Sequence, residues 1–484
     1  MWLLLTTACA EPGPFAARAA WLQAELTADN AWWITRSPTL VEDKYARMAA
    51  DPYDWLRGSN AVFLADQVRP DPERPRTRFL SVEDAASVLL VGDPHLENLG
   101  TCLAGEEPDP DEATRPYGED GAPLLLEWVD LDASTHGPWT FDARRAALSL
   151  ALVAEEAEEC VGCLAPAISA FAGAYADEIT ARERGEPGWD AGAEGMGEGA
   201  LVAALRESVR EDGLLSAAHD DFTVVEADED GIGHRRIALD ERLDADGDGI
   251  LPLGVGDAAR LDRVLAGWTD GRPAGFRRLD AARLYGKGVA SLPATRFVVL
   301  WDRGDAGLED DRLLNVREVV DPPSVDGLYA GLGSVYADNA DRVAAVAAQL
   351  WSRPDADVRM GAVADGAAAF KTTSLSGWFD TFDHAAVDRA FTLQVATATD
   401  LDALASTLGR ALASAHARGT TLDGAPALGV VADDLAAGGG REAFVEERVR
   451  DVTDDLATLR ADHALFLALL DDAGPLLGAE VLYP

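Results

Sequence analysis

A chain of 484 residues with 48% hydrophobic and 7% aromatic content is long and apolar enough to bury a large core, which excludes wholesale disorder. Its formal net charge of -44 argues against nucleic acid or an anionic membrane surface as a partner, because both would have to be neutralised by Lys and Arg. A bound nucleotide would need positive charge gathered locally, from Arg or a metal ion. The basic residues are almost all Arg, and the lysines are Lys44, Lys287 and Lys371.

Residues 1–13, MWLLLTTACAEPG, are apolar up to a small residue before Cys9. They lack the positive start and the longer apolar core of a complete signal peptide. Two interpretations stay open: a lipoprotein signal with a misplaced start, in which Cys9 carries a lipid anchor, or an N-terminus without a targeting role. We favour the first, and with it an extracytoplasmic over a cytoplasmic location, because Ala-Cys followed by a polar, Pro-containing tether is typical of lipoproteins. No other stretch is long and apolar enough to span a bilayer.

Residues 14–67 carry apolar side chains at spacings of three and four, which predicts helices. Within them, the segment DPYDWLRGS contains Arg57. We expect this side chain either to reach a phosphate or, preferably, to brace the following loop through a carboxylate. The prolines of residues 69–78 then predict an exposed connector.

Two apolar runs that are each followed by acidic residues carry the candidate site. Residues 87–91 predict a short buried strand that breaks into a polar loop with Asp93 and Asn98, and residues 124–129 predict a second strand that delivers Asp130 and Asp132. Phosphoryl transfer suits this layout, because it needs one carboxylate to orient the attacking hydroxyl and an amide oxygen with other carboxylates to hold Mg²⁺. The five-residue step from Asp93 to Asn98 is also that of the Asp and Asn in the protein-kinase catalytic loop.

The motifs VGDPHLEN, EWVDLD and GPWTFDARRAA occur in the order found in the aminoglycoside and choline phosphotransferase branch of the protein-kinase-like superfamily, which this segment resembles. More closely, GDPHLENLG, VDLD, GPWTFDARRAALS and LASAHARG are similar to an uncharacterised bacterial domain-of-unknown-function family placed in that superfamily. The resemblance is dense over residues 44–152 and patchy over 279–419. It implies an α+β, bilobal, protein-kinase-like fold with a mostly helical large lobe and a small antiparallel-sheet lobe.

The resemblance also implies roles for single residues. Asp93 would be the catalytic base, with ATP as the nucleotide. Asn98, Asp130 and Asp132 would be the Mg²⁺ ligands. Asp142, together with Arg144 or Arg145, would brace the loop from behind. Val91 stands where the family usually has a His, which normally supports the loop without touching substrate.

Three features of the middle of the chain leave alternatives open. Cys160 and Cys163 form a CVGC motif, which predicts a local disulfide or two buried thiols and not a zinc site, since a second CxxC is lacking. Residues 222–239 alternate around DEDG and predict a hairpin. Asp244, Asp246 and Asp248 begin an EF-hand-like loop without its final Glu, so we hold open a Ca²⁺ site against a solvated acidic turn.

A Gly-rich turn with Gly286, Lys287 and Gly288 precedes the predicted strand TRFVVLW and could cover nucleotide phosphates through its backbone N–H groups. The next predicted strand, LLNVREVV, carries Arg317 where the resembling family usually has a phosphate-pairing Lys. Arg keeps the charge but changes its geometry. Lys287 and Lys371 are candidates to compensate.

This order is permuted relative to ordinary kinases, because the Gly-rich turn follows the catalytic loop and the helix with LASAHARG comes last. A circular permutation would explain it, and chain ends that lie close together would make it tolerable. We therefore divide the chain into a signal or tether (1–13), a helical lobe with the catalytic loop (14–220), a sheet-containing nucleotide lobe (221–395) and helices that complete the large lobe (396–484). His416 is expected to be structural.

The preferred hypothesis is a Mg²⁺-dependent ATP phosphotransferase that acts on an unknown hydroxyl of a small molecule or a protein. The alternative is an inactive kinase-like pseudoenzyme or surface-binding lipoprotein, motivated by Arg317 and by the N-terminal segment. A third hypothesis is a hydrolase metal centre made of Asp93, His95, Asp130 and Asp132, whose ligand types suit divalent metals.

Overall fold

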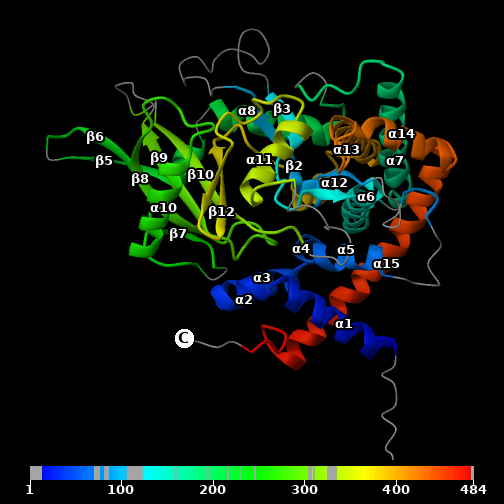
Figure 1. Cartoon of the computed structure of the whole chain (residues 1–484), viewed down its shortest axis with the longest axis horizontal. Helices are drawn as coiled ribbons and strands as arrows, with labels where there is room; N and C mark the ends of the chain where they lie inside the picture. The colour runs from blue at the N-terminus through cyan, green and yellow to red at the C-terminus, as the bar shows by residue number, and fades with distance from the viewer. Residues whose placement is uncertain are drawn as a thin grey trace, which may run out of the picture.

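The computed structural model describes residues 14–69, 77–80, 87–105, 124–157, 160, 162–192, 196–214, 217–228, 230–244, 247–302, 308, 311–323 and 335–480. It is a mixed α+β structure, as predicted, with a six-stranded antiparallel sheet beside a larger helical part (Figure 1). The predicted lipid-anchor residue Cys9 lies outside the described residues.

The main sheet has the spatial order β11-β12-β10-β9-β8-β7. Its strands are β7 Gly249–Pro252, β8 Arg277–Tyr285, β9 Arg296–Asp302, β10 Asp311–Val319, β11 Gly361–Asp365 and β12 Ala368–Leu375. Successive side chains point to opposite faces. Phe297 and Trp301 of β9 pack with helix α10 (Val255–Gly267) on the outer face, while Val298 and Leu300 lie on the inner face. The strands predicted from TRFVVLW and LLNVREVV are thus confirmed.

Long helices form most of the large hydrophobic core. They are α6 Trp139–Glu156, α7 Leu164–Glu183, α13 Ala398–Arg418, α14 Ala427–Ala437 and α15 Gly440–Ala473. Small residues let two of them approach closely: a Cβ at Gly409 of α13 would lie 2.3 Å from the backbone oxygen of Phe171 in α7. The helix predicted around LASAHARG is therefore α13, and it packs in the centre of the helical part (Figure 1).

Five helices open the described chain, in agreement with the predicted helical pattern. They are α1 Pro14–Asp29, α2 Ala31–Arg36, α3 Pro38–Ala50, α4 Pro52–Gly58 and α5 Asn60–Val68. In Figure 1 they run below the sheet and the helical part, with α1 beside the end of α15. Arg36 and Arg47 of this segment contact the sheet part, so these helices connect the two parts of the molecule.

The remaining elements are short. They are β1 Val88–Leu90 paired with β4 Thr135–Gly137, η1 Leu96–Asn98, β2 Leu99–Leu103 paired with β3 Leu124–Trp128, β5 Thr223–Ala227 paired with β6 Gly233–Ile237, α8 Ala200–Leu214, α9 Ala217–Phe222, α11 Asn339–Leu350 and α12 His384–Thr392. The β5–β6 pair is the predicted hairpin, and it projects beyond the main sheet (Figure 1).

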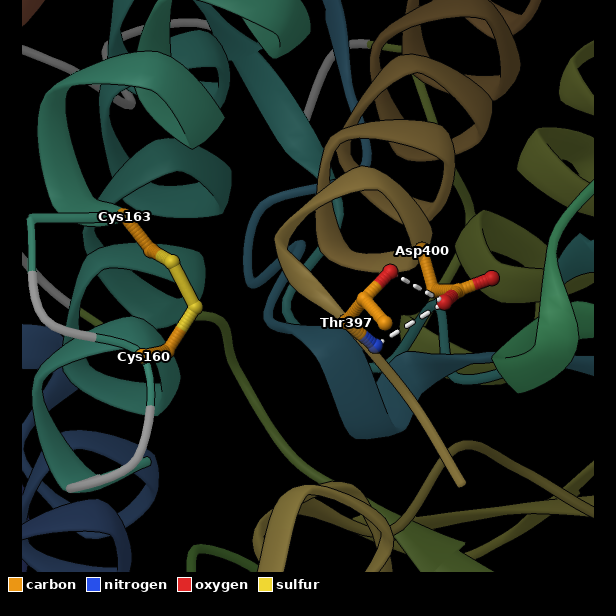
Figure 2. Close-up of a disulfide and its surroundings, with 4 residues drawn as sticks. All are labelled: Cys160, Cys163, Thr397 and Asp400. Atoms are coloured by element: carbon orange, nitrogen blue, oxygen red, sulfur yellow. Dashed lines mark hydrogen bonds between the residues drawn. A yellow bond between two sulfur atoms is a disulfide. The ribbon is translucent and has the colours of Figure 1, made fainter. Parts of the chain in front are cut away.

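Cys160 and Cys163 form a disulfide between α6 and α7, so the first of the two predicted alternatives for the CVGC motif is confirmed. Figure 2 shows this bond and also the N-terminus of α13. There the carboxylate of Asp400 accepts hydrogen bonds from the backbone N–H (2.9 Å) and the hydroxyl (2.7 Å) of Thr397. This capping box supplies partners that the first turn of a helix lacks.

Within the described ranges, none of the helices has both the length and the apolar composition that crossing a membrane requires.

Candidate functional site

Residues 91–98, the 91–98 loop, join β1 to β2 and are held from behind by a buried acid. Asp142, in the first turn of α6, accepts hydrogen bonds from the backbone N–H groups of Val91 (2.7 Å) and Gly92 (3.1 Å). His416 donates to the same carboxylate (3.0 Å) and accepts from the hydroxyl of Tyr175 (2.8 Å). Asp142 therefore braces the loop, and His416 is structural, as predicted.

Asp93 follows Gly92 on this loop and is buried. Its carboxylate accepts a hydrogen bond from Nε of Arg145 at 2.8 Å. The amide nitrogen of Asn98 donates to the backbone oxygen of Asp93 (2.8 Å), which leaves the amide oxygen as the end that can face a cation. Of the two arginines proposed as braces, Arg145 thus acts on the loop, whereas Arg144 pairs with Asp455 of α15.

Asp130 and Asp132 follow β3 and meet two cations of the main sheet. Nη2 of Arg317 is 2.7 Å from Asp130 and also contacts Asp132. Nζ of Lys371 is 2.5 Å from Asp132 and 3.5 Å from Asp130. Burial opposes ionisation of Asp130, but Arg317 and Lys371 outweigh it and lower its pKa. The structure therefore brings together Asp130, Asp132, Arg317 and Lys371, all of which the sequence singled out.

Arg317 and Lys371 belong to a row of three cations, Arg296, Arg317 and Lys371, which we call the cation row. Arg296 of β9 is directly opposite Arg317 of β10, and Arg317 is opposite Lys371 of β12. Within the described residues Arg296 has no carboxylate within 4.0 Å, and its hydrogen-bond partner is the hydroxyl of Ser291 at 3.4 Å. Burial and the neighbouring Arg317 lower the pKa of Arg296 to about 9. Like charges opposite each other on a sheet are unfavourable, so this row is suited to receive an anion.

The Gly-rich turn connects β8 to β9, at the end of the sheet where the cation row lies. Gly286 and Gly288 have φ of 76° and 80°, values that favour glycine. The guanidinium of Arg47 donates to the backbone oxygen of Gly286 at 2.6 Å, and this ties the turn to α3. The side chain of Lys287 is exposed on the turn.

The acidic turn before β7 contacts the same arginine as the Gly-rich turn. The carboxylate of Asp248 pairs with Arg47, and Asp244 accepts a hydrogen bond from the backbone N–H of Asp248 at 2.9 Å. Asp246 lies outside the described residues. The Ca²⁺ site therefore stays a prediction, with one of its ligands already paired with a guanidinium.

On the other side of the 91–98 loop, Arg57 lies 3.0 Å from the carboxylate of Glu97, which is the bracing role preferred from the sequence. Glu97 also accepts a hydrogen bond from Nδ1 of His384 at 2.6 Å. Burial disfavours the charge on Glu97, but His384 and Arg57 lower its pKa to about 2. Burial likewise disfavours protonated His384, whereas the bond to Glu97 raises its pKa above the ordinary value.

Metal-ligand atoms gather in one further place. Within the described chain, Glu97, Asp383 and His384 are the group of three or more His, Cys, Asp or Glu side chains whose ligand atoms lie within 4.8 Å of one another. The guanidinium of Arg57 next to Glu97 opposes a cation there. The four residues of the hydrolase hypothesis, Asp93, His95, Asp130 and Asp132, are not assembled into such a group.

A cavity of about 120 Å³ lies between the N-terminal helices, the 91–98 loop and the connection from β8 to β9. Its wall includes Asp93 and Asp132 together with Lys44, Asn60 and Ala290. The last three residues, like Arg296, were not predicted as site residues. Period-two alternation in TRFVVLW could have placed Arg296 on the inner face, whereas no local pattern points to Asn60.

The fold and the site define an α+β protein in which a loop carboxylate, two strand-end carboxylates and a row of three cations surround one region. Residues 36–469 match the family described as an uncharacterized protein conserved in bacteria (DUF2252), and the chain therefore belongs to this family. No curated protein and no solved structure matches the chain.

Proposed function

We propose that the chain is a Mg²⁺-dependent phosphotransferase that uses ATP and has a protein-kinase-like architecture. The observation that carries this proposal is the cation row. Three cations lie in register across β9, β10 and β12, and the two nearby carboxylates contact Arg317 and Lys371 but not Arg296. The inner face of the sheet therefore offers more positive charge than the described residues neutralise there. The phosphates of a nucleotide would supply the missing negative charge.

The arrangement gives each predicted residue a role. Asp93 would accept the proton of the attacking hydroxyl, and its bond to Arg145 keeps the carboxylate oriented. Asn98, Asp130 and Asp132 offer the oxygen ligands that Mg²⁺ prefers. When bound, Mg²⁺ would neutralise charge on the phosphates. The Gly-rich turn would cover those phosphates, with Arg296 and Arg317 beneath them.

The order of elements supports a permuted kinase-like fold. In protein kinases a Gly-rich loop is followed by a basic residue on the third strand and then by a helix whose Glu pairs with it. Here the Gly-rich turn, Arg317 on β10 and helix α11 follow in the same order, but after the 91–98 loop. Helix α11 contains no Glu, and Arg317 pairs with Asp130 and Asp132 instead.

The test is transfer of the γ-phosphate, followed as ADP formation by the purified full chain with Mg²⁺ and pooled hydroxyl compounds. Asp93→Asn should lower the rate by about a hundredfold or more, as expected for loss of a general base. Asp355→Asn, an exposed acid paired with Arg353, is the matched control and should retain the rate. Full activity in the Asp93→Asn variant would exclude this role.

A nucleotide-binding pseudoenzyme is the second candidate, because Arg317 and Lys371 already neutralise the two acids that would hold Mg²⁺. It predicts ATP binding without ADP formation for any acceptor. If it is also a surface lipoprotein, Cys9→Ser should release the protein from the membrane fraction of expressing cells.

A further inference from the structure

We propose that the cavity beside Asp93 binds a small, uncharged compound with several hydroxyl groups, and that this compound is the phosphoryl acceptor. Its role as acceptor rests on the proposed function. The class of ligand is argued from the cavity itself and is tested separately.

The size of the cavity limits the ligand. The cavity holds about 120 Å³ and is open to solvent on one side, whereas an engineered closed cavity of about 150 Å³ holds benzene, so the part of the ligand inside it has about six non-hydrogen atoms. The walls combine apolar surface from Trp33, Ala61 and Val320 with a few polar groups. This is the composition of a site for a small organic molecule.

The charges in the interior of the cavity already have oppositely charged neighbours. These buried or half-buried pairs are Asp93 with Arg145, Asp132 with Lys371, Glu318 with Arg36, and Lys44 with Asp29. Asp321, at the exposed rim, accepts a hydrogen bond from the amide of Asn339. A charged ligand would therefore enter a buried site without a counter-ion of its own, which is unfavourable.

One neutral group in the wall lacks a partner. Asn60 is 4% exposed, and its amide nitrogen donates to the backbone oxygen of Gly92 at 2.9 Å. Its amide oxygen is buried and has no hydrogen-bond partner among the described residues. An unpaired buried acceptor of this kind calls for a donor, and a ligand hydroxyl supplies one.

Lys44 provides the complementary donor. The residue is 3% exposed, and its ammonium donates to the side-chain oxygen of Asn30 at 2.8 Å. An ammonium has three donors, so protons remain for an oxygen in the cavity. Asn60 and Lys44 together present one acceptor and one donor, which a compound with two or more hydroxyl groups satisfies.

Asp93 in the same wall gives the bound hydroxyl its chemistry. The O–H proton would pass to the Asp93 carboxylate as the hydroxyl oxygen bonds to the γ-phosphorus. The bond between that phosphorus and the bridging oxygen would break, and its electron pair would leave with ADP. The products are a phosphate ester, ADP and the proton taken up by Asp93.

The experiment measures ligand binding by calorimetry and thermal shift, with the full chain and without nucleotide. The uncharged probes are glycerol, D-glucose and myo-inositol, and the charged ones are ethanolamine, choline and glycerate. Asn60→Leu removes the free acceptor. Ala290→Phe fills the cavity from an exposed position in case the first variant folds poorly. Gln67→Leu, which removes a half-buried amide on the same helix but outside the cavity wall, is the matched control.

We expect saturable binding of at least one uncharged probe, weakened about tenfold or more by Asn60→Leu and by Ala290→Phe but not by Gln67→Leu. Polyols also stabilise folded proteins in general, by an effect that increases without saturation and is equal in all variants. If this is the only effect that the uncharged probes have, the proposal is wrong. Saturable binding of charged probes only would also overturn it.

ATP binding, measured in parallel, separates the two proposals. If ATP does not bind while a polyol binds in an Asn60-dependent manner, the proposed function fails and the ligand class stands. If ATP binds and only the charged probes bind in the cavity, the proposed ligand class is wrong and the proposed function stands.

Discussion

Arg296 and Arg317 are directly opposite each other on β9 and β10, yet they have different surroundings. Arg317 contacts the carboxylates of Asp130 and Asp132, whereas the partner of Arg296 among the described residues is the hydroxyl of Ser291. Two adjacent guanidinium groups repel each other. Arg317 contacts the two carboxylates directly, whereas Asp130 and Asp132 favour the charge on Arg296 only from a greater distance. The sheet therefore carries a local penalty that an anionic ligand would relieve.

This difference predicts opposite effects of two similar substitutions on the ligand-free protein. Arg296→Leu should raise the free energy of unfolding by about 1 kcal/mol, because it removes a repelling and poorly paired charge. Arg317→Leu should lower it by about 3 kcal/mol, because it removes a buried guanidinium that contacts two half-buried carboxylates. Urea unfolding measures both values, and Arg277→Leu, at an exposed position at the start of β8, is the control. Equal destabilisation by the two variants would contradict the account.

The central acids of the site could be predicted because each directly follows a short apolar strand. The residues of the loop, the strand ends and two members of the cation row came together as the motifs indicated. The sequence motifs do not single out Arg296, although alternation places it on the inner face, because only Arg317 occupies the position of the resembling family's Lys. The wall formed by Lys44 and Asn60 could not be predicted, since it depends on how separate helices pack against the sheet part.

Asp142 is expected to be the most important brace of the 91–98 loop for stability. Asp142→Ala should lower the free energy of unfolding by about 3 kcal/mol, because it leaves two buried backbone N–H groups and His416 without their acceptor. Chemical denaturation provides the measurement. Asp177→Ala breaks an exposed pair with Arg441 and should change stability by less than about 0.5 kcal/mol. A similar change in both variants would rule out the bracing role.

Arg47 is expected to position the Gly-rich turn without touching the reacting atoms. Its guanidinium binds the backbone oxygen of Gly286 and the carboxylate of Asp248. Arg47→Ala should therefore raise KM for ATP by about tenfold while kcat changes little, because the turn would cover the phosphates less well. Steady-state kinetics with ATP as the varied substrate separate the two constants. A loss confined to kcat would show that Arg47 acts in another way.

The bond between His384 and Glu97 makes stability depend on pH in a defined direction. The pKa of His384 is raised in the folded protein, so its contribution is fully present below the ordinary pKa of about 6.5 and is lost as pH rises through the raised value. Glu97 has a pKa of about 2, so it stays ionised over the whole pH range in which His384 titrates. His384→Gln should therefore lower the free energy of unfolding by about 1 kcal/mol at about pH 5.5 and by less at about pH 9. A loss of unfolding free energy on His384→Gln that is larger at high pH than at low pH would refute this.

The central claim is that the inner face of the main sheet binds the phosphates of a nucleotide. Calorimetric titration of the full chain with ATP in excess Mg²⁺ tests it most directly, with Arg296→Leu as the variant that should fold at least as well as the parent protein. The account predicts saturable binding by the parent protein and an affinity about tenfold or more lower in the variant. No binding by the parent protein, or equal affinity in both, would contradict it.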